Sequence, residues 1–381
     1  RMILVYTHQI SPRLQYVFKM VFKQFLNCDV RFTSLVEEFI ADDGVKISYT
    51  KNPLGSELFF QSHSILFEKG IVDQDIKVKS KNGHKVFFEQ GENSALPFDV
   101  FAASFYLLSR YEEYLPHVKD ELGRFPATES LAYKEGFLKQ PVVDVWAHQF
   151  KEILLETFPQ MEFPHKQLTI HNVIEAKRPF EFLQRGVLRN ILGFGGDLWK
   201  LKLGRFFLRI RVLLHLRKDP YDTFSWMLNN VRNSASKLTI FFLLGEAFSY
   251  REDFNTKRQT FKSLVKYVAD YCEVGLMFSF YSVEEYEKLK VERFQMEDIT
   301  HRTLQSSTND RQLVNLPLVY RNLVELEIKN DFTMFYYNEI GFRAGTCTPF
   351  LFYDLDYEVK TPLVLQPVIG KSLALTLGKE K

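Results

Sequence analysis

Apolar runs that are short enough for buried strands alternate along this chain with segments whose apolar residues recur at helical spacing. In the first part of the chain, strand patterns occupy residues 3–6, 30–32, 45–49, 58–60, 76–78 and 86–88. Helical patterns occupy residues 14–26, 98–114 and 148–158. Asp99 falls in the first turn of the second predicted helix, where a carboxylate suits the helix dipole. Asn82-Gly83, between two strand patterns, is typical of a hairpin turn.

The second part of the chain repeats this alternation more regularly. Strand patterns occupy residues 167–174, 238–244 and 274–281, and shorter candidates lie at 332–335, 341–343 and 351–352. Helical patterns occupy residues 179–216, 219–227, 261–271, 283–292 and 318–326. Strands that alternate with helices indicate parallel βαβ units, as in a barrel. The sequence therefore predicts an α/β fold.

The length of 381 residues favours two domains, because a single apolar core rarely grows that large. Residues 159–165 contain two prolines among residues of mixed polarity, which indicates a boundary. We therefore predict a smaller N-terminal α/β domain over 1–160 and a second domain over 166–381.

Composition narrows the function only slightly. The net charge of +2 gives no reason to expect a nucleic-acid partner. The 37 phenylalanines predict aromatic cores. The more specific alternative is that some aromatic rings form a platform on which sugars stack. Cys28, Cys272 and Cys347 lie far apart, which fits a reducing compartment, and no secretory or membrane-spanning segment is apparent. We expect a cytoplasmic protein.

Positive charge concentrates in residues 177–218, where eleven lysines and arginines face only Glu181 and Asp197. Trp199 and several Phe, Leu and Ile side chains are interleaved with these cations. One interpretation is a packed helical hairpin with a solvated basic face. The other is an amphipathic surface that contacts anionic membrane lipid.

Several longer segments carry a resemblance to a known family. They are FDVFAASFYLLSRYEEYLPH (98–117), the block 123–147, KDPYDTFSWM (218–227), FFLLG (241–245), LPLVYRNLVEL (316–326) and GFRAGTCTPFLFYDL (341–355). They resemble bacterial polysaccharide-deacetylase-like proteins that carry an N-terminal domain of unknown function. The resemblance implies a distorted (β/α) barrel over 166–381, C-terminally truncated and possessing a basic helical insertion at 177–218. It also implies zinc in active relatives, held by one Asp and two His, and acetyl hydrolysis on cell-envelope polysaccharide.

The residues expected to carry that chemistry are mostly replaced here. Glu175 takes the acidic place after the first strand, and Met277 stands where a metal-binding His is expected. Asp310 lies near the place of the second His, and no His follows His301 to protonate the leaving amine. Arg343 matches the family's arginine, which orients a carboxylate.

Arg343 should pair with Glu175 or Asp354, and Glu175, Asp310 and His171 are the remaining metal-ligand candidates.

Three functional hypotheses follow. The first hypothesis is a metal-dependent carbohydrate deacetylase. The second is a non-catalytic relative that binds a glycan or a partner enzyme, and the third is a basic peripheral-membrane scaffold in polysaccharide assembly. The missing His residues favour weak or absent hydrolysis.

Overall fold

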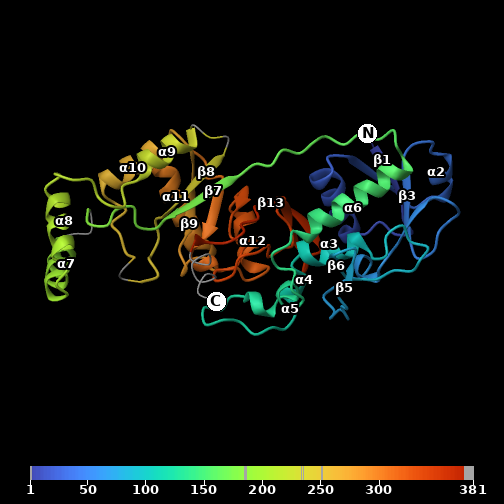
Figure 1. Cartoon of the computed structure of the whole chain (residues 1–381), viewed down its shortest axis with the longest axis horizontal. Coiled ribbons are helices and arrows are strands. Elements are labelled where there is room, and N and C mark those ends of the chain that lie inside the picture. Colours follow the sequence, from blue (N-terminus) through green and yellow to red (C-terminus); the bar gives the residue numbers. More distant parts are fainter. Residues whose placement is uncertain (1, 184–186, 233, 235, 250–251, 373–381) are drawn as a thin grey trace. The chain divides into compact units, whose positions relative to one another are not determined.

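The computed structural model describes residues 2–183, 187–232, 234, 236–249 and 252–372 (Figure 1). The chain forms two compact units, which are described separately below. The first unit combines residues 1–166 with 312–381, and the second unit contains residues 167–311. The segment after residue 311 therefore groups with the N-terminal residues, whereas the sequence alone placed it with residues 166–311.

A four-stranded parallel sheet organises the N-terminal part of the first unit, in the order β2-β1-β3-β4. Its strands are β1 (Met2–Tyr6), β2 (Asp29–Thr33), β3 (Lys46–Thr50) and β4 (Leu58–Gln61). The register pairs Leu4 with Arg31 and Val5 with Ile47. Ile3, Leu4 and Val5 are buried, as expected for a parallel strand that is covered on both faces. All four predicted strands are confirmed.

Helices of the first unit pack a large aromatic core. They are α1 (Pro12–Lys19), the π-helical η1 (Met20–Phe25), α2 (Val36–Ala41), α3 (Val100–Leu108), α4 (Tyr111–Tyr114), α5 (Leu131–Lys134) and α6 (Val142–Thr157), with 3₁₀ turns at Ser64–Leu66 and Ala127–Glu129. Asp99 caps α3 and accepts hydrogen bonds from the backbone N–H groups of Phe101 and Ala102. Every residue of α3 is buried. The helix predicted over 98–114 breaks at Arg110, whose φ of 53° is left-handed.

The remaining strands of the first unit are short. The hairpin β5 (Lys79–Lys81) and β6 (His84–Val86) turns at Asn82-Gly83, as predicted, but residues 76–78 are not a strand. After α12 (Leu318–Glu325) come β11 (Asn330–Asp331), β12 (Phe350–Asp354) and β13 (Val359–Leu365), in the order β12-β13-β11. The predicted strands at 332–335 and 341–343 are wrong, because these residues form loops.

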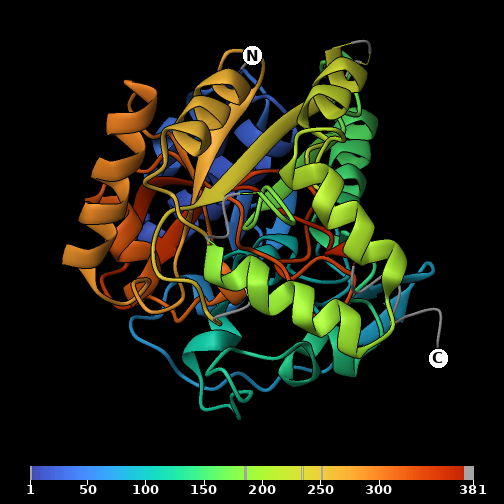
Figure 2. The ribbon, with the colours of Figure 1, turned by 90° about the vertical axis from the view of Figure 1, so that its left-hand side faces the viewer.

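The second unit contains four parallel strands in the order β10-β9-β8-β7. They are β7 (His171–Ala176), β8 (Lys237–Leu243), β9 (Glu273–Phe278) and β10 (Ser306–Asn309), and a 3₁₀ turn (Asp310–Gln312) follows β10. The helices are α7 (Val187–Trp199), α8 (Leu203–Leu213), α9 (Phe224–Arg232), α10 (Gln259–Ala269) and α11 (Tyr286–Thr300) (Figure 2).

The mixed α/β class that the sequence predicts is confirmed, whereas closure into a deacetylase-type barrel stays a prediction. In the part of the chain that the structure describes, no helix is both long and apolar enough to cross a membrane.

Candidate functional site

Three polar residues and a glycine lie at the carboxyl ends of the four parallel strands of the second unit. Lys177 follows β7, Gly245 lies just beyond β8, Ser279 follows β9 and Asp310 follows β10. Parallel strands end at the same edge of a sheet, and this edge is where α/β proteins place their ligands. We call these residues, with their direct partners, the strand-end cluster.

An ion pair between Lys177 and Asp310 dominates the strand-end cluster. Asp310 is fully buried, and its Oδ1 accepts hydrogen bonds from the Lys177 ammonium and from the Arg311 backbone N–H at 2.9 Å. Its Oδ2 is also buried and has no hydrogen-bond partner among the groups that the structure describes. The lysine offsets the cost of burying this carboxylate.

Two further carboxylates of the cluster are held by protein groups. Glu292 of α11 accepts hydrogen bonds from the Ser279 backbone N–H at 3.0 Å and from the Ser279 hydroxyl. Burial raises the pKa of Glu292, and the nearby charge of Asp310 raises it further. Gly245 makes room for this carboxylate, since a Cβ there would lie 2.1 Å from Glu292 Oε1. Glu252 pairs with the Arg311 guanidinium at 2.5 Å.

The predicted metal ligands do not assemble into one site. His171 opens β7 and its Nε2 lies 2.8 Å from Thr239 Oγ1, whereas Glu175 is four residues further along the strand. Four residues of a strand span about 13 Å, so these two side chains cannot ligate the same ion. His171 and Glu175, two of the three candidate metal ligands, are therefore not brought together.

Met277 is completely buried inside β9, next to Thr308 of β10 in the sheet register. Among the described residues, no group of three or more His, Cys, Asp or Glu side chains could hold a metal ion. Asp310 does lie at the strand ends, but it is bound to a lysine, and it forms no such group with a described histidine. This donor set does not fit the zinc that the resemblance implies.

Arg343 lies in the first unit and has a carboxylate partner, but not the one predicted. It is buried, and its Nε and Nη2 donate to the two carboxylate oxygens of Glu113 at 2.9 and 2.8 Å. Its Nη1 donates to the Phe335 carbonyl at 3.1 Å. The expectation of Glu175 as its partner is therefore wrong. Asp354, the other candidate, instead accepts from Arg321.

Glu113 belongs to a buried cluster of charges built around α4. Arg110 donates to Glu113 at 2.8 Å, to Glu112 at 3.0 Å and to the Tyr336 hydroxyl at 3.2 Å. Burial alone would raise the pKa of Glu113, but the guanidinium groups of Arg343 and Arg110 lower it to about 2. Arg110 Nη1 is buried without a hydrogen-bond partner among the described groups. We call these residues the Arg343 cluster.

A pocket of about 230 Å³ adjoins the Arg343 cluster within the first unit. Its lining consists of Asp120, Arg124, Phe125, Pro126, Ala127, Thr128, Gln312, Phe335, Tyr336, Tyr337, Asn338, Glu339 and Arg343. Arg124 lies over the Tyr337 ring at 4.9 Å and pairs with Asp120 at 2.8 Å. Sequence reasoning missed this pocket, although charged residues inside the apolar pattern 98–114 were a sign of it.

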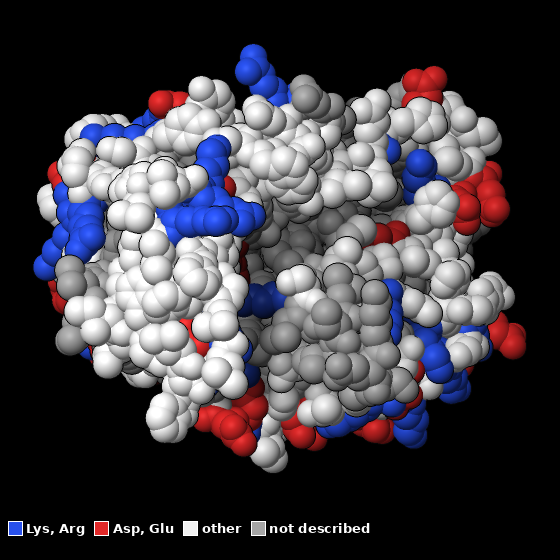
Figure 3. Space-filling model, turned by 60° about the vertical axis from the view of Figure 1, so that its left-hand side comes forward, with Lys and Arg blue, Asp and Glu red and all other residues white. Residues whose placement is uncertain are grey.

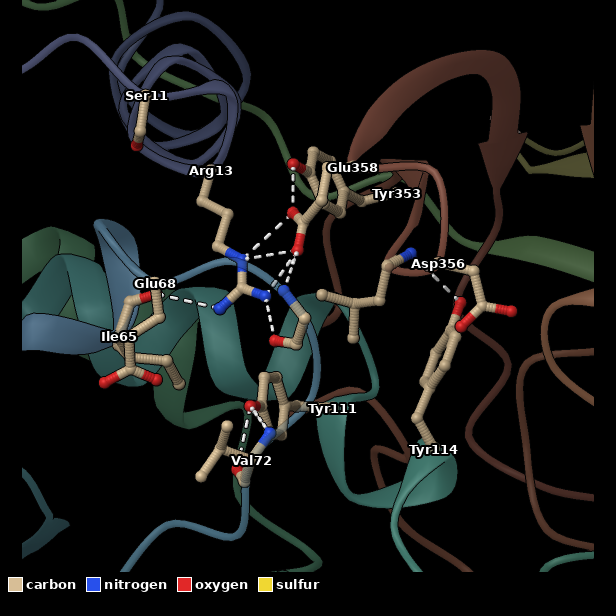
Figure 4. A network of polar contacts seen from close by, with 12 residues as sticks. Ser11, Arg13, Ile65, Glu68, Val72, Tyr111, Tyr114, Tyr353, Asp356 and Glu358 are labelled. Atoms are coloured by element: carbon tan, nitrogen blue, oxygen red, sulfur yellow. Dashed lines mark hydrogen bonds and ion pairs between the residues drawn. The ribbon is translucent and has the colours of Figure 1, made fainter.

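Another buried arginine, Arg13 of α1, has a structural role (Figure 4). It donates to Glu358 through Nε at 3.1 and 3.0 Å and through Nη2 at 2.5 Å. It also donates to the Ile65 carbonyl at 2.9 Å and the Gly70 carbonyl at 2.5 Å. Tyr353 donates its hydroxyl to Glu358 at 2.9 Å. The network connects α1 to the turn before β13. All the hydrogen bonds of the Arg13 guanidinium named above go to protein groups.

Comparison with known proteins gives one match. Residues 3–159, which fall inside the first unit, match a family of unknown function, DUF7033. No curated protein and no solved structure matches the chain.

Proposed function

We propose that this chain is a non-hydrolytic relative of the polysaccharide deacetylases that binds a sugar unit. The observation that carries the proposal is the ion pair at the strand ends, in which the Lys177 ammonium is bound to the Asp310 carboxylate. A catalytic zinc needs about three protein ligands and an open position for water. An ammonium bound to the buried Asp310 carboxylate opposes a second cation at that place.

The pocket beside the Arg343 cluster suits a neutral sugar. Phe125, Tyr336 and Tyr337 line the pocket, and the C–H groups of a sugar ring can pack against such rings. Each ring also has an arginine near it, at 4.9 to 5.8 Å from its centre. Of the charged lining residues, Arg124 pairs with Asp120 and Arg343 pairs with Glu113, while Glu339 contributes a further carboxylate. These groups and the Asn338 amide can bond to hydroxyls, which both donate and accept.

The size of the pocket limits the ligand to a small one. Sites for drug-sized molecules measure roughly 300–1,000 Å³, and this pocket of about 230 Å³ lies below that range. A single sugar ring is therefore the unit we propose. The barrel closure of the polysaccharide-deacetylase family is part of the same proposal. So is a cytoplasmic location, which the free thiols of Cys28, Cys272 and Cys347 support.

The test uses the whole purified chain. We expect elemental analysis to find less than stoichiometric zinc, and acetate release from N-acetylglucosamine oligomers to stay at background. Titration calorimetry with the same oligomers should show binding that Tyr337→Ala weakens about tenfold, the loss expected for one ring contact. Tyr271→Ala is the matched control, because Tyr271 is exposed in the second unit and does not line this pocket.

Two results would overturn the proposal. The first is stoichiometric zinc together with acetate release that Asp310→Ala abolishes, which would establish an enzyme. The second is oligomer binding that is absent, or that both tyrosine variants weaken equally, which would remove the pocket from the sugar site.

A further inference from the structure

The basic region predicted from the sequence folds as a helical hairpin of α7 and α8 (Figures 1 and 2). Inside the hairpin, buried Arg209 of α8 donates to Asp197 of α7 at 3.0 and 2.9 Å. Gly193 permits this close approach, because a Cβ there would lie 2.4 Å from the guanidinium. Asp197 is the only acidic residue of 187–218, and it is paired within the hairpin.

The outer surface of the hairpin is strongly apolar. Trp199 at the end of α7 is 90% exposed, and Leu201 in the connection to α8 is 83% exposed. Other large apolar side chains that are exposed here are Ile191, Leu192, Leu198, Leu203, Phe207, Leu214 and Leu216. Many exposed apolar side chains on one hairpin are typical of an interaction site, because single exposed apolar side chains are normal but large groups of them are not.

Free positive charge accompanies this apolar surface. Several cations of the predicted region are engaged by the protein: Lys177 with Asp310, Arg189 with Asp253, Arg205 with Glu181 and Arg209 with Asp197. The exposed cations that form no ion pair with the described residues are Lys200, Lys202, Arg211, Arg217 and Lys218. Arg185 lies outside the described residues. In Figure 3, Lys and Arg side chains stand beside a broad uncharged surface.

We infer that the α7–α8 hairpin docks on an anionic lipid surface. The sequence Trp199-Lys200-Leu201-Lys202-Leu203 alternates exposed apolar and cationic side chains at the tip. Tryptophan and leucine enter the interface between headgroups and acyl chains, while lysines bind anionic headgroups. No described helix could cross a membrane, so the contact is peripheral. An apolar protein surface would match the exposed apolar side chains of the hairpin but not its five cations that form no ion pair with the described residues. Anionic lipid matches both the apolar side chains and the cations.

The experiment measures partition of the whole chain onto vesicles of phosphatidylcholine, alone or with about one-third phosphatidylglycerol. Trp226→Phe removes the other exposed tryptophan, so that Trp199 reports insertion while Trp146 stays buried. We expect a blue shift on the anionic vesicles that high salt suppresses. Lys200→Gln with Lys202→Gln should weaken partition about 30-fold, from about 1 kcal/mol per cation. Leu201→Ser should reduce the blue shift.

The control removes two exposed lysines elsewhere in the second unit, as Lys288→Gln with Lys290→Gln, and should change partition less than threefold. All these side chains are solvent-exposed, and unchanged circular dichroism will verify the fold of each variant. Sedimentation without vesicles tests the alternative occupant, a second copy of the chain. The inference is overturned by partition that is absent, equal on neutral vesicles or equally reduced by the control. Hairpin-dependent self-association without vesicle binding overturns it too.

Discussion

Replacing Glu113 with glutamine should strongly destabilise the first unit. The substitution keeps the shape of the side chain but leaves the buried Arg343 guanidinium without its carboxylate. Removing one partner of a buried ion pair costs about 3–5 kcal/mol of unfolding free energy. The Glu113 pKa gives a similar figure, because a shift from 4.5 to about 2 corresponds to about 3 kcal/mol.

The pKa also fixes the pH dependence. Since the folded-state pKa of Glu113 is lowered, its contribution is present above pH 4.5 and is lost as the pH falls towards 2. Wild type should therefore lose stability below pH 4.5 more steeply than Glu113→Gln. The assay is urea unfolding at pH 3–7, followed by the fluorescence of Trp146, which is buried in the first unit. Trp199→Phe and Trp226→Phe remove the other tryptophans.

Asp75→Asn is the matched control, because the Asp75–Lys77 pair lies in the same unit with both side chains largely exposed. Exposed pairs contribute about 0–1 kcal/mol, so the control should unfold nearly as wild type does. A loss below 1 kcal/mol for Glu113→Gln, or an unchanged difference between wild type and variant from pH 7 to pH 3, would refute the reasoning.

Three further predictions concern single positions. Gly245→Ala places a Cβ 2.1 Å from Glu292 Oε1 and should destabilise the second unit by about 1–3 kcal/mol in thermal unfolding. Lys177→Met leaves Asp310 buried without its cation and should cost about 3 kcal/mol at neutral pH in urea unfolding. Burial raises the pKa of Asp99 to about 6, so its stabilising contribution is present below pH 3.8 and is lost as the pH rises through 6. Asp99→Asn should abolish that loss in urea unfolding at pH 4 and 7 while still capping its helix.

Each of these three has an opposing result. Gly245→Ala that melts with wild type would mean that the Glu292 carboxylate moves aside freely. If Lys177→Met were as stable as wild type at pH 7, Lys177 would not be offsetting the cost of burying the Asp310 carboxylate. If Asp99→Asn kept the wild-type change in stability between pH 4 and 7, another group would be the source of that change.

Local patterns in the sequence were sufficient for many of the elements. Strands β1, β3 and β8 were predicted from their apolar runs, the β5–β6 turn from Asn82-Gly83, and the start of α3 from Asp99. Each depends on residues within a few positions of one another, because backbone propensity, capping and burial periodicity act locally. The concentration of cations in 177–218 was equally plain from the sequence.

The tertiary structure decided what depends on distant residues. Strand β10 has the sequence Ser-Ser-Thr-Asn, which carries no apolar pattern, yet all four residues are buried beside β9. Arg343 was expected to bind an acid, but only the fold brings Glu113, 230 residues earlier, to its guanidinium. His171 and Glu175 share a strand, but their separation along it excludes a common ion. The spacing of apolar residues predicts which face of an element turns to the core. The residues that contact that face are determined by the packing of distant segments against one another.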